Sequence, residues 1–467
     1  MVFTSHIFIF YFLPLTLAVY YFLPTRFRNA FLTFVSYLFY GWWKPWFVLL
    51  MMASTVVDYF CARTISAPLS SPQRRRTALI TSMVVNLGLL GVFKYSMFGM
   101  ENLNRLLELV GADALGVLQI TLPIGISFYT FQTLSYTIDV YRGEAPPVRS
   151  FSDFSCFVSL FPQLIAGPIV RYNTVADQLA ERNHTLTRFS SGVALFILGF
   201  SKKILLANPM GIVADAAFGA ESLSVLDAWF GVTAYAFQIY FDFSGYSDMA
   251  IGLGRMLGFE FPRNFNAPYL ADGITDYWRR WHISLSTFLR DYLYIPLGGN
   301  RRGSRRTYLN LGVVMLLGGL WHGAAWTFVI WGLYHGLILG FERRLGKQSL
   351  YAGLPRPVRV VLTFVLILFS WVLFRSPTIT AAGDYFAAMF GQTETGLAAL
   401  LIAAELYTPA HLVLMACCAV VTFQPVQTFG WSVELSWLKV LLLGPLFLLA
   451  VAEMFTQAFN PFLYFQF

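Results

Sequence analysis

The chain has 467 residues, of which 57% are hydrophobic, 18% are aromatic and only 12% are charged. Because soluble domains carry about 25% charged residues, this composition excludes an ordinary soluble enzyme and indicates a polytopic membrane protein. Lys and Arg (32) outnumber Asp and Glu (24), but the basic residues lie in short loops between apolar runs, where the positive-inside bias places them. No basic stripe lies on a soluble domain, so nucleic-acid binding is not expected.

The cysteines and histidines show no metal-binding pattern. Cys61, Cys156, Cys417 and Cys418 lie in or beside apolar segments without ligand spacing. Neither an HExxH motif nor a paired Cys/His pattern occurs. We therefore expect buried thiols and no metal.

The first expected spans are apolar runs that end at basic residues. Residues 7–23 form the first span, because no basic residue precedes them and the run is too long for the core of a signal peptide. Arg26 and Arg28 follow it, which places the N-terminus outside the cytosol. Residues 30–60 indicate a hairpin broken at Gly41-Trp42-Trp43-Lys44-Pro45, and residues 77–93 cross outward.

The next segments are more polar or more interrupted. Residues 121–139 carry many hydroxyl side chains, which either bond to their own helix or to neighbouring helices, or line a wet cavity. Residues 151–170 contain two proline breaks and indicate a re-entrant segment. Residues 190–206 form an outward span, 208–227 an external acidic loop, and 228–254 a return span.

The run at 309–341 is the stretch around which the chain is organised. A single helix of this length would be about 50 Å long, against a hydrocarbon core of about 30 Å. Basic residues flank both ends, so the sequence predicts a hairpin that turns near Trp321-His322-Gly323. His322 then lies roughly 20 Å from the basic end, and an ionisable ring at that depth is a functional-site hypothesis. On burial alone, a histidine that caps the turn by bonding a carbonyl is an equal alternative.

The remaining segments complete an all-α membrane fold. Residues 360–374, 411–423 and 438–455 are expected spans, whereas 377–409 is too polar to assign. The sequence predicts one integral-membrane domain over 1–467 with about eleven to thirteen transmembrane or re-entrant helices. Within it, 120–342 is the expected catalytic core and 343–467 the less specific C-terminal helices.

Several side chains are candidates for chemistry. An apolar environment favours a neutral imidazole at His322, which can act as a general base toward a hydroxyl. His282 lies in the segment DYWRRWHISLS, where periodicity favours an interface residue, and His335 is expected to pack or to hydrogen-bond. Arg279, Arg280 and Arg290 either bind phosphates or face lipid headgroups.

Two carboxylates lie within the expected span 228–254. Asp242 and Asp248 differ by six positions, about 240° around a helix, so they do not share a face. Either can orient an imidazole. The alternative is a structural pair with Arg255 or with Lys202 or Lys203.

Long motifs add a family resemblance. The segments SYLFYGWWKPWF, LPIGISFYTFQTLSYTIDVYR, FPQLIAGPIVRY, QIYFDFSGYSDMAIGLGRMLGF, DYWRRWHISLSTFLRDYLYIPLGGNR and LGGLWHGAAWTFVIWGLYHG resemble bacterial members of the membrane-bound O-acyltransferase family that acetylate polysaccharides. The resemblance runs from Met1 to about Phe341, and the remainder is similar only in hydropathy. It implies helices around a funnel or tunnel that meets at a catalytic histidine, here His322. His282 matches the family's second motif position, where many eukaryotic members have Asn.

The resemblance also implies a reaction. An acetyl group would move from a cytosolic thioester, acetyl-CoA, to hydroxyls of an exported polysaccharide such as alginate, through a periplasmic partner acetyltransferase. Acetyl-CoA would be a co-substrate, with no permanently bound cofactor, and the protein would lie in the bacterial inner membrane. Arg279, Arg280, Arg290 and Trp281 would meet the donor, and Asp242 would hold the ring of His322. The alternatives are D-alanyl transfer from a carrier protein and a transporter without chemistry.

Overall fold

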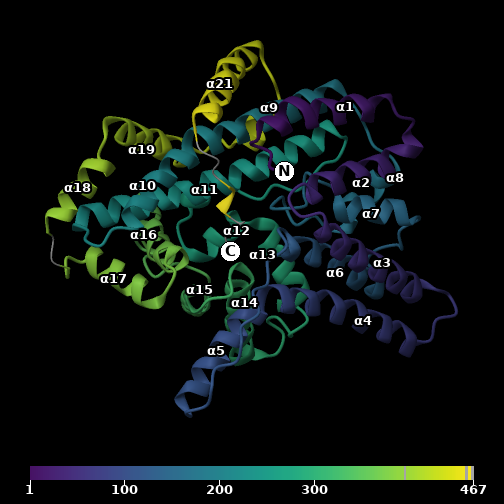
Figure 1. The fold of residues 1–467 in the computed structure, drawn as a ribbon, viewed down its shortest axis with the longest axis horizontal. Coiled ribbons are helices and arrows are strands. Elements are labelled where there is room, and N and C mark those ends of the chain that lie inside the picture. Colours follow the sequence, from purple (N-terminus) through teal and green to yellow (C-terminus); the bar gives the residue numbers. More distant parts are fainter. Residues whose placement is uncertain (394–395, 458–460, 464–467) are drawn as a thin grey trace. The chain divides into compact units, whose positions relative to one another are not determined.

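The computed structural model describes residues 1–393, 396–457 and 461–463. Within these ranges every regular element is a helix (Figure 1), which confirms the expected all-α class. The chain divides into two compact units. The first comprises Met1–Val193 with Ala250–Pro262, and the second comprises Ala194–Met249 with Arg263–Phe467.

The first unit holds the N-terminal helices. Pro24 and Pro45 lie immediately before two of them, so the expected break near Gly41 to Pro45 is confirmed. The helices are η1 (Phe8–Phe12), α1 (Leu13–Phe22), α2 (Thr25–Gly41), α3 (Trp46–Ser66), α4 (Pro72–Leu90), η2 (Gly91–Tyr95), α5 (Ser96–Leu109), α6 (Ile126–Arg142), α7 (Phe151–Ser159), α8 (Tyr172–Ala180) and the start of α9 (Leu186–Ser201).

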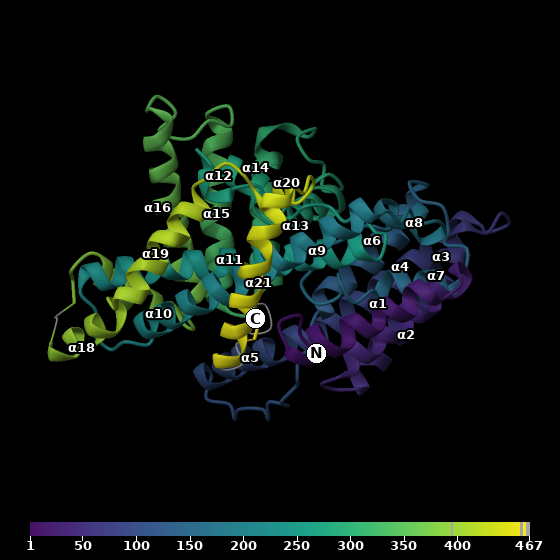
Figure 2. The ribbon, with the colours of Figure 1, turned by 90° about the horizontal axis from the view of Figure 1, so that it is seen from above.

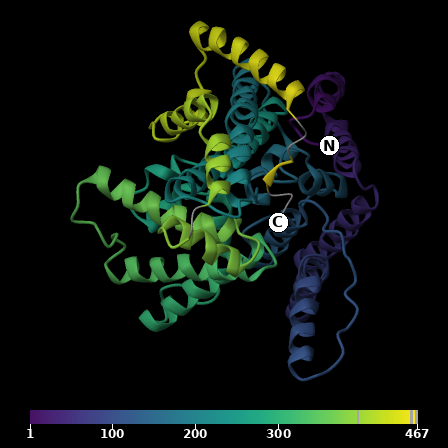
Figure 3. The ribbon, with the colours of Figure 1, turned by 60° about the vertical axis from the view of Figure 1, so that its left-hand side comes forward.

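A buried polar cluster joins α3, α4 and α6. Helices α3 and α4 lie side by side (Figures 1 and 3). Ser82 Oγ donates to Asp58 Oδ1 at 2.6 Å, and Asn86 Nδ2 donates to both Asp58 oxygens at 2.9 Å. Thr133 Oγ1 of α6 donates to Asn86 Oδ1 at 3.0 Å. The buried carboxylate is thus hydrogen-bonded on each oxygen, as a buried acid requires.

Several hydroxyls of α6 bond to their own helix, and two of these also bond to neighbouring α4. Thr133, Ser135 and Thr137 donate to the carbonyls of Thr130, Gln132 and Leu134, respectively, at 2.7 to 3.2 Å. This is the first of the two interpretations that the sequence allowed for this polar span.

The chain after α7 is irregular and buried, as its breakers predict. Residues 160–170 form no helix, yet all of them are buried. The backbone N–H of Phe161 donates to Ser36 Oγ at 3.0 Å. A Cβ on Gly167 would lie 2.6 Å from Gln163 Cα, so only glycine fits this turn. The protein itself therefore supplies hydrogen-bond partners for this backbone, which lipid cannot supply.

The second unit holds the long central helix and the C-terminal helices. These are η3 (Lys202–Ala207), α10 (Asn208–Phe218), α11 (Val225–Met256, whose last turns belong to the first unit), η4 (Pro268–Leu270), α12 (Ile274–Arg280), α13 (Ile283–Leu289), η5 (Arg290–Tyr294), α14 (Gly303–His322), α15 (Trp326–Arg344), α16 (Arg356–Arg375), α17 (Ile379–Met389), α18 (Leu397–Leu406), α19 (Pro409–Thr422), α20 (Thr428–Trp431) and α21 (Trp437–Thr456).

The expected external loop at 208–227 is wrong over its first half. Helix α10 covers Asn208–Phe218, because Pro209 sits in its first turn, where a missing N–H costs nothing. Its acidic residue, Asp215, pairs with Arg375 at 2.6 Å. The unassigned region 377–409 likewise contains α17 and α18.

The predicted hairpin is confirmed. Helix α14 ends at His322 and α15 begins at Trp326, and the two helices lie side by side with α16 next to α15 (Figure 2). A Cβ on Gly319 would lie 2.2 Å from the Phe328 carbonyl oxygen, and one on Gly332 would lie 2.3 Å from that of Met315. These two glycines let the helix backbones touch.

Five helical segments of the described chain are long and apolar enough to cross a membrane. They are Trp46–Ser66, Pro72–Leu109, Leu186–Phe218, Arg356–Arg375 and Trp437–Thr456. A sixth results if the pair Ala398–Leu406 and Pro409–Thr422, bent by 59°, is one span. The chain is a multi-pass membrane protein. The expected eleven to thirteen elements also counted shorter and more polar helices, such as α6.

Candidate active site

His322 is the last residue of α14 and lies in a shell of aromatic rings. Its side chain is buried, with 5% of the residue exposed. The ring centroid is 5.1 Å from those of Trp321 and Trp331 and 5.3 Å from that of Phe374, each at a steep interplanar angle. Helices α14, α15 and α16 each contribute a ring. The imidazole therefore sits where electrostatic interactions are weakly screened.

His282 lies at the corner between α12 and α13. The corner is held by Asn264, whose carbonyl accepts from the N–H of Ile283 at 2.9 Å. Asn264 Oδ1 also accepts from Ser284, from the N–H at 3.2 Å and from Oγ at 2.9 Å. His282 has φ 44° and ψ 55°, a left-handed conformation that is uncommon for residues other than Gly, although Asn, Asp and His are enriched in it. The backbone geometry turns its side chain into the interior.

The two histidines meet across this interior. Their ring centroids are 6.4 Å apart, and His282 also lies 4.6 Å from Phe243 and 5.9 Å from Trp321. His282 is fully buried, and burial lowers the pKa of its imidazole to about 3. His282 is therefore neutral at physiological pH, because burial disfavours the imidazolium.

His335 continues this row of rings on α15. It lies one helical turn after Trp331, with centroids 4.8 Å apart. Trp278 Nε1 of α12 donates to His335 Nδ1 at 3.3 Å. In the neutral ring the proton must then be on Nε2, because Nδ1 accepts. The expected packing and hydrogen-bonding role of His335 is what the structure shows.

Asp242 and Asp248 form ion pairs between η3 and α11. Lys203 Nζ lies 2.5 Å from Asp242 Oδ1, and Lys202 Nζ lies 2.7 Å from Asp248 Oδ2. The N–H of Leu463 also donates to Asp242 Oδ2 at 2.8 Å. Of the alternatives that the sequence left open, the structure thus shows the lysine pairs. Contact of Asp242 with the His322 ring stays a prediction.

The residues expected to meet the donor differ in their surroundings. Arg279 is exposed, whereas Arg280 pairs with Asp276 at 2.7 Å and Arg290 pairs with Asp291 at 2.6 Å. Trp281 is buried, and its ring lies 5.0 Å from that of Phe265 and 5.1 Å from that of Trp371. It packs beside the corner that carries His282, and its contact with the donor stays a prediction.

Three residues at this site were missed from the sequence. Trp331 and Phe374 complete the shell around His322, and Glu342 accepts from the N–H groups of Ile274 and Thr275 at 2.8 and 2.7 Å. This carboxylate therefore fixes the start of α12. For Trp331 the sequence did offer a signal, because Trp331 and His335 are four residues apart and so lie on one helix face.

The chain that carries this site matches a known family. The membrane-bound O-acyltransferase family, as a sequence family, matches residues 144–375. The chain belongs to this family and is a membrane-bound O-acyltransferase.

Individual relatives extend the match. The probable alginate O-acetylase AlgI of Pseudomonas putida is 42% identical, with both chains covered in full. The peptidoglycan O-acetyltransferase of Helicobacter pylori is 37% identical over 85% of this chain and 81% of its own length. The teichoic acid D-alanyltransferase of Bacillus subtilis is 27% identical over 54% of this chain and 68% of its own. The full-length match shows that the likeness beyond Phe341 is more than hydropathy.

Proposed function

We propose that this protein moves an acetyl group from acetyl-CoA, on the cytosolic side of the bacterial inner membrane, toward hydroxyls of an exported polysaccharide. The observation that carries the proposal is the pair of buried histidines, His322 and His282, with ring centroids 6.4 Å apart where His322 ends α14 at the turn of the α14–α15 hairpin. Two relatives, whose names state O-acetylation of alginate and of peptidoglycan, support the acceptor class.

In the proposed reaction His322 is the general base. It takes the proton of an acceptor hydroxyl as the oxygen attacks the thioester carbonyl, so that an O–C bond forms while the C–S bond breaks. The imidazolium then returns the proton to the departing thiolate, which leaves as free CoA. The aromatic shell supports this role, because an apolar surrounding keeps the resting imidazole neutral.

His282 is proposed as the positioning residue. Its neutral ring lies between Phe243 and Trp321, and Trp321 in turn contacts His322. A second neutral imidazole at this distance can support the first without adding charge. Arg279 is the exposed cation of the DYWRR segment and is proposed to meet the donor phosphates at the cytosolic edge.

The acceptor is proposed to approach from outside. A thioester made in the cytosol and a polymer outside the cell require an acyl group to cross the bilayer, and a buried site in a multi-pass protein suits that need. A periplasmic acetyltransferase is the proposed partner that passes the group to the polymer.

The first prediction concerns His322. Replacement by Ala should lower acetylation of the exported polymer by at least about 100-fold, because loss of a general base costs about 10²–10⁴ in rate. The measurement is acetate released from the polymer by base, together with transfer of radiolabel from acetyl-CoA in inverted membrane vesicles.

A matched control is His411→Ala, since His411 lies on α19 and its ring bonds the Glu405 carbonyl at 3.0 Å. This variant should retain acetylation. Unchanged acetylation in His322→Ala, at normal protein level, would remove His322 from the mechanism.

D-alanyl transfer is the second candidate, favoured by the likeness to the Bacillus subtilis enzyme over part of the chain. The same vesicles decide between the two. Label from acetyl-CoA should enter the acylated polymer. If only label from a D-alanyl carrier protein enters it, D-alanyl transfer is the function.

A further inference from the structure

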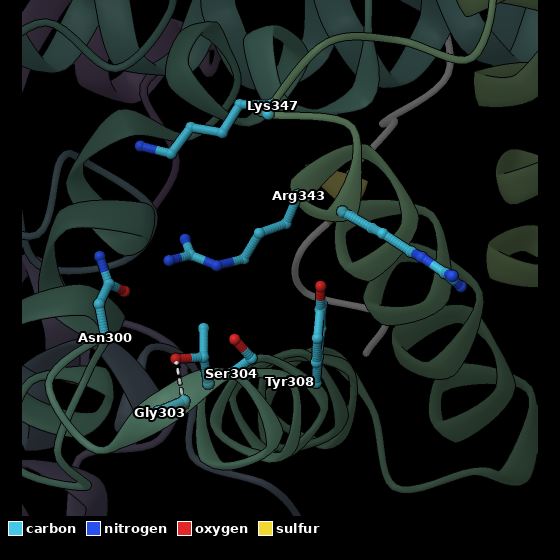
Figure 4. A pocket seen from close by; sticks show the side chains of 9 residues that line it. Asn300, Gly303, Ser304, Tyr308, Arg343 and Lys347 are labelled. Atoms are coloured by element: carbon cyan, nitrogen blue, oxygen red, sulfur yellow. Dashed lines mark hydrogen bonds between the residues drawn. The ribbon is translucent and has the colours of Figure 1, made fainter.

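A basic cavity lies at the end of the α14–α15 hairpin that is remote from His322. Its volume is about 520 Å³, and its lining includes Asn300, Ser304, Tyr308, Arg343, Arg344 and Lys347, all of the second unit. The side chains of Arg343 and Lys347 extend into the space beside Asn300 and Ser304 (Figure 4).

The cations of this cavity carry no counter-charge. No Asp or Glu lines it. Among the described residues, none of Arg343, Arg344 and Lys347 forms an ion pair. The adjacent acid, Glu342, accepts instead from the first N–H groups of α12. Arg343 and Lys347 therefore place two positive charges in a cavity that no Asp or Glu of the described residues lines.

The backbone at Lys347 is held in an unusual conformation. Its φ is 68°, in the left-handed region that disfavours a residue with a Cβ. The turn is fixed because the Lys347 N–H donates to the Glu342 carbonyl at 2.7 Å and the Gly346 N–H to that of Arg343 at 3.1 Å. Glycine or asparagine would fit better, so the lysine at this position points to a role for its charge.

The opposite rim is also fixed. Thr307 Oγ1 donates to the Gly303 carbonyl at 3.0 Å, and Asn310 Nδ2 donates to that of Gly299 at 3.1 Å. Tyr308 packs near α15, since a Cβ on Gly340 would lie 3.6 Å from its ring. The hydroxyl-bearing wall is therefore held facing the basic wall.

We propose that this cavity binds a phosphate ester. Guanidinium groups pair phosphate oxygens bidentately, a lysine adds a point charge, and the facing hydroxyl and amide groups donate further hydrogen bonds. The phosphate ester has two sources, the headgroup of an anionic phospholipid or a soluble phosphate ester. Basic pockets between membrane helices on the cytosolic side suit lipid headgroups. The proposal does not depend on the acyl-transfer reaction.

The test measures binding to the purified full-length protein in phosphate-free detergent buffer, in two arms. The first arm measures retention of dioleoyl phosphatidylglycerol, against dioleoyl phosphatidylcholine, by native mass spectrometry. The second arm titrates adenosine 3′,5′-bisphosphate by calorimetry. Arg343→Gln with Lys347→Gln should weaken binding roughly tenfold or more in at least one arm, because charge-assisted bonds to phosphate are lost.

The matched control is Arg305→Gln with Arg306→Gln, which removes the same charge from exposed positions of α14 that do not line the cavity. It should change binding less than about twofold. A selective loss in the lipid arm identifies a headgroup, and one in the bisphosphate arm identifies a soluble ester. Equal losses in the two double variants, or no binding in either arm, would overturn the proposal.

Lys347→Gly is a second variant that tests the proposal even if the double variant misfolds. It removes one charge while relieving the left-handed backbone, so thermal stability should hold or rise as binding weakens. Unchanged binding in this variant, with unchanged binding in the double variant, would also overturn the proposal.

Discussion

His282 combines two features that rarely occur in one residue. Its backbone is left-handed, at φ 44°, and its side chain is fully buried. Asparagine tolerates that backbone better than most residues, so His282→Asn is the substitution that removes the imidazole while preserving the corner. Alanine lacks the short polar side chain by which asparagine tolerates the left-handed region. Any study of this position needs the asparagine variant to separate backbone from ring.

The second prediction follows from the pKa of His282. Because burial lowers this pKa from 6.5 to about 3, the unfolded chain binds a proton between these values that the folded chain does not. The folded state is therefore favoured above pH 6.5 and loses that advantage as the pH falls toward 3, by up to about 1.4 kcal/mol per pH unit. Between pH 7 and pH 5, thermal unfolding of the wild type in detergent should shift down more than that of His282→Asn. Parallel shifts in the two proteins would contradict a buried neutral imidazole.

At the scale of elements, the α14–α15 hairpin depends on close backbone contact. A Cβ on Gly332 would lie 2.3 Å from the Met315 carbonyl oxygen, whereas one on Gly312 meets nothing within 4 Å. Both glycines belong to this pair of helices, yet an added Cβ would clash only at Gly332. They form a matched pair for substitution.

The third prediction uses this pair. Gly332→Ala should destabilise the protein by about 1–3 kcal/mol, because the added methyl forces the helices apart. Gly312→Ala should be neutral or stabilising, since alanine favours a helix by up to about 1 kcal/mol over glycine. Thermal unfolding in detergent measures both. Equal effects would show that the hairpin is looser than its backbone contacts indicate.

The fourth prediction concerns the ion pair between η3 and α11. The side chains of Lys203 and Asp242 are 5% and 1% exposed, so Lys203→Met leaves a buried carboxylate without its cation, at a cost of about 3–5 kcal/mol. The double variant Lys203→Met with Asp242→Asn should recover at least half of that loss, because it removes the orphaned charge. The yield of folded protein after detergent extraction is the measurement, and a double variant no better than the single one would show that the loss does not come from an orphaned carboxylate.

At the scale of the whole molecule, the membrane orientation rests on the distribution of charge. Leu69, in the loop before Arg74, is fully exposed, and Leu118, in the segment after α5, is 76% exposed. The basic flank assigns Leu69 to the cytosol and Leu118 to the outside.

The fifth prediction tests this orientation. In a Cys417→Ser background, a membrane-impermeant maleimide should label Leu118→Cys in intact spheroplasts, and Leu69→Cys only after permeabilisation. Cys417 is removed because it is the exposed native cysteine, whereas Cys61, Cys156 and Cys418 are buried. The reverse labelling pattern would invert the orientation and place the proposed donor side outside the cell.

Local signals explain why much of the fold was predictable. The hairpin turn near His322 was located correctly, because apolar length and basic flanks are properties of the sequence around it. The prediction of a loop at 208–227 was wrong over its first half, because the deciding contact is not local. Asp215 looked like a loop residue, but its charge is matched by Arg375, 160 positions away.

The sequence by itself determined an all-helical membrane protein of an acyltransferase family. It also identified His322 and His282 as candidate site residues. The tertiary structure alone decided which rings enclose them, that Asp242 pairs with Lys203, and that Arg343 and Lys347 share a cavity. Hydropathy and turn chemistry act over a few residues, whereas these contacts join segments as distant as Asp242 and Leu463, which are 221 positions apart. Only the folded backbone brings such partners together.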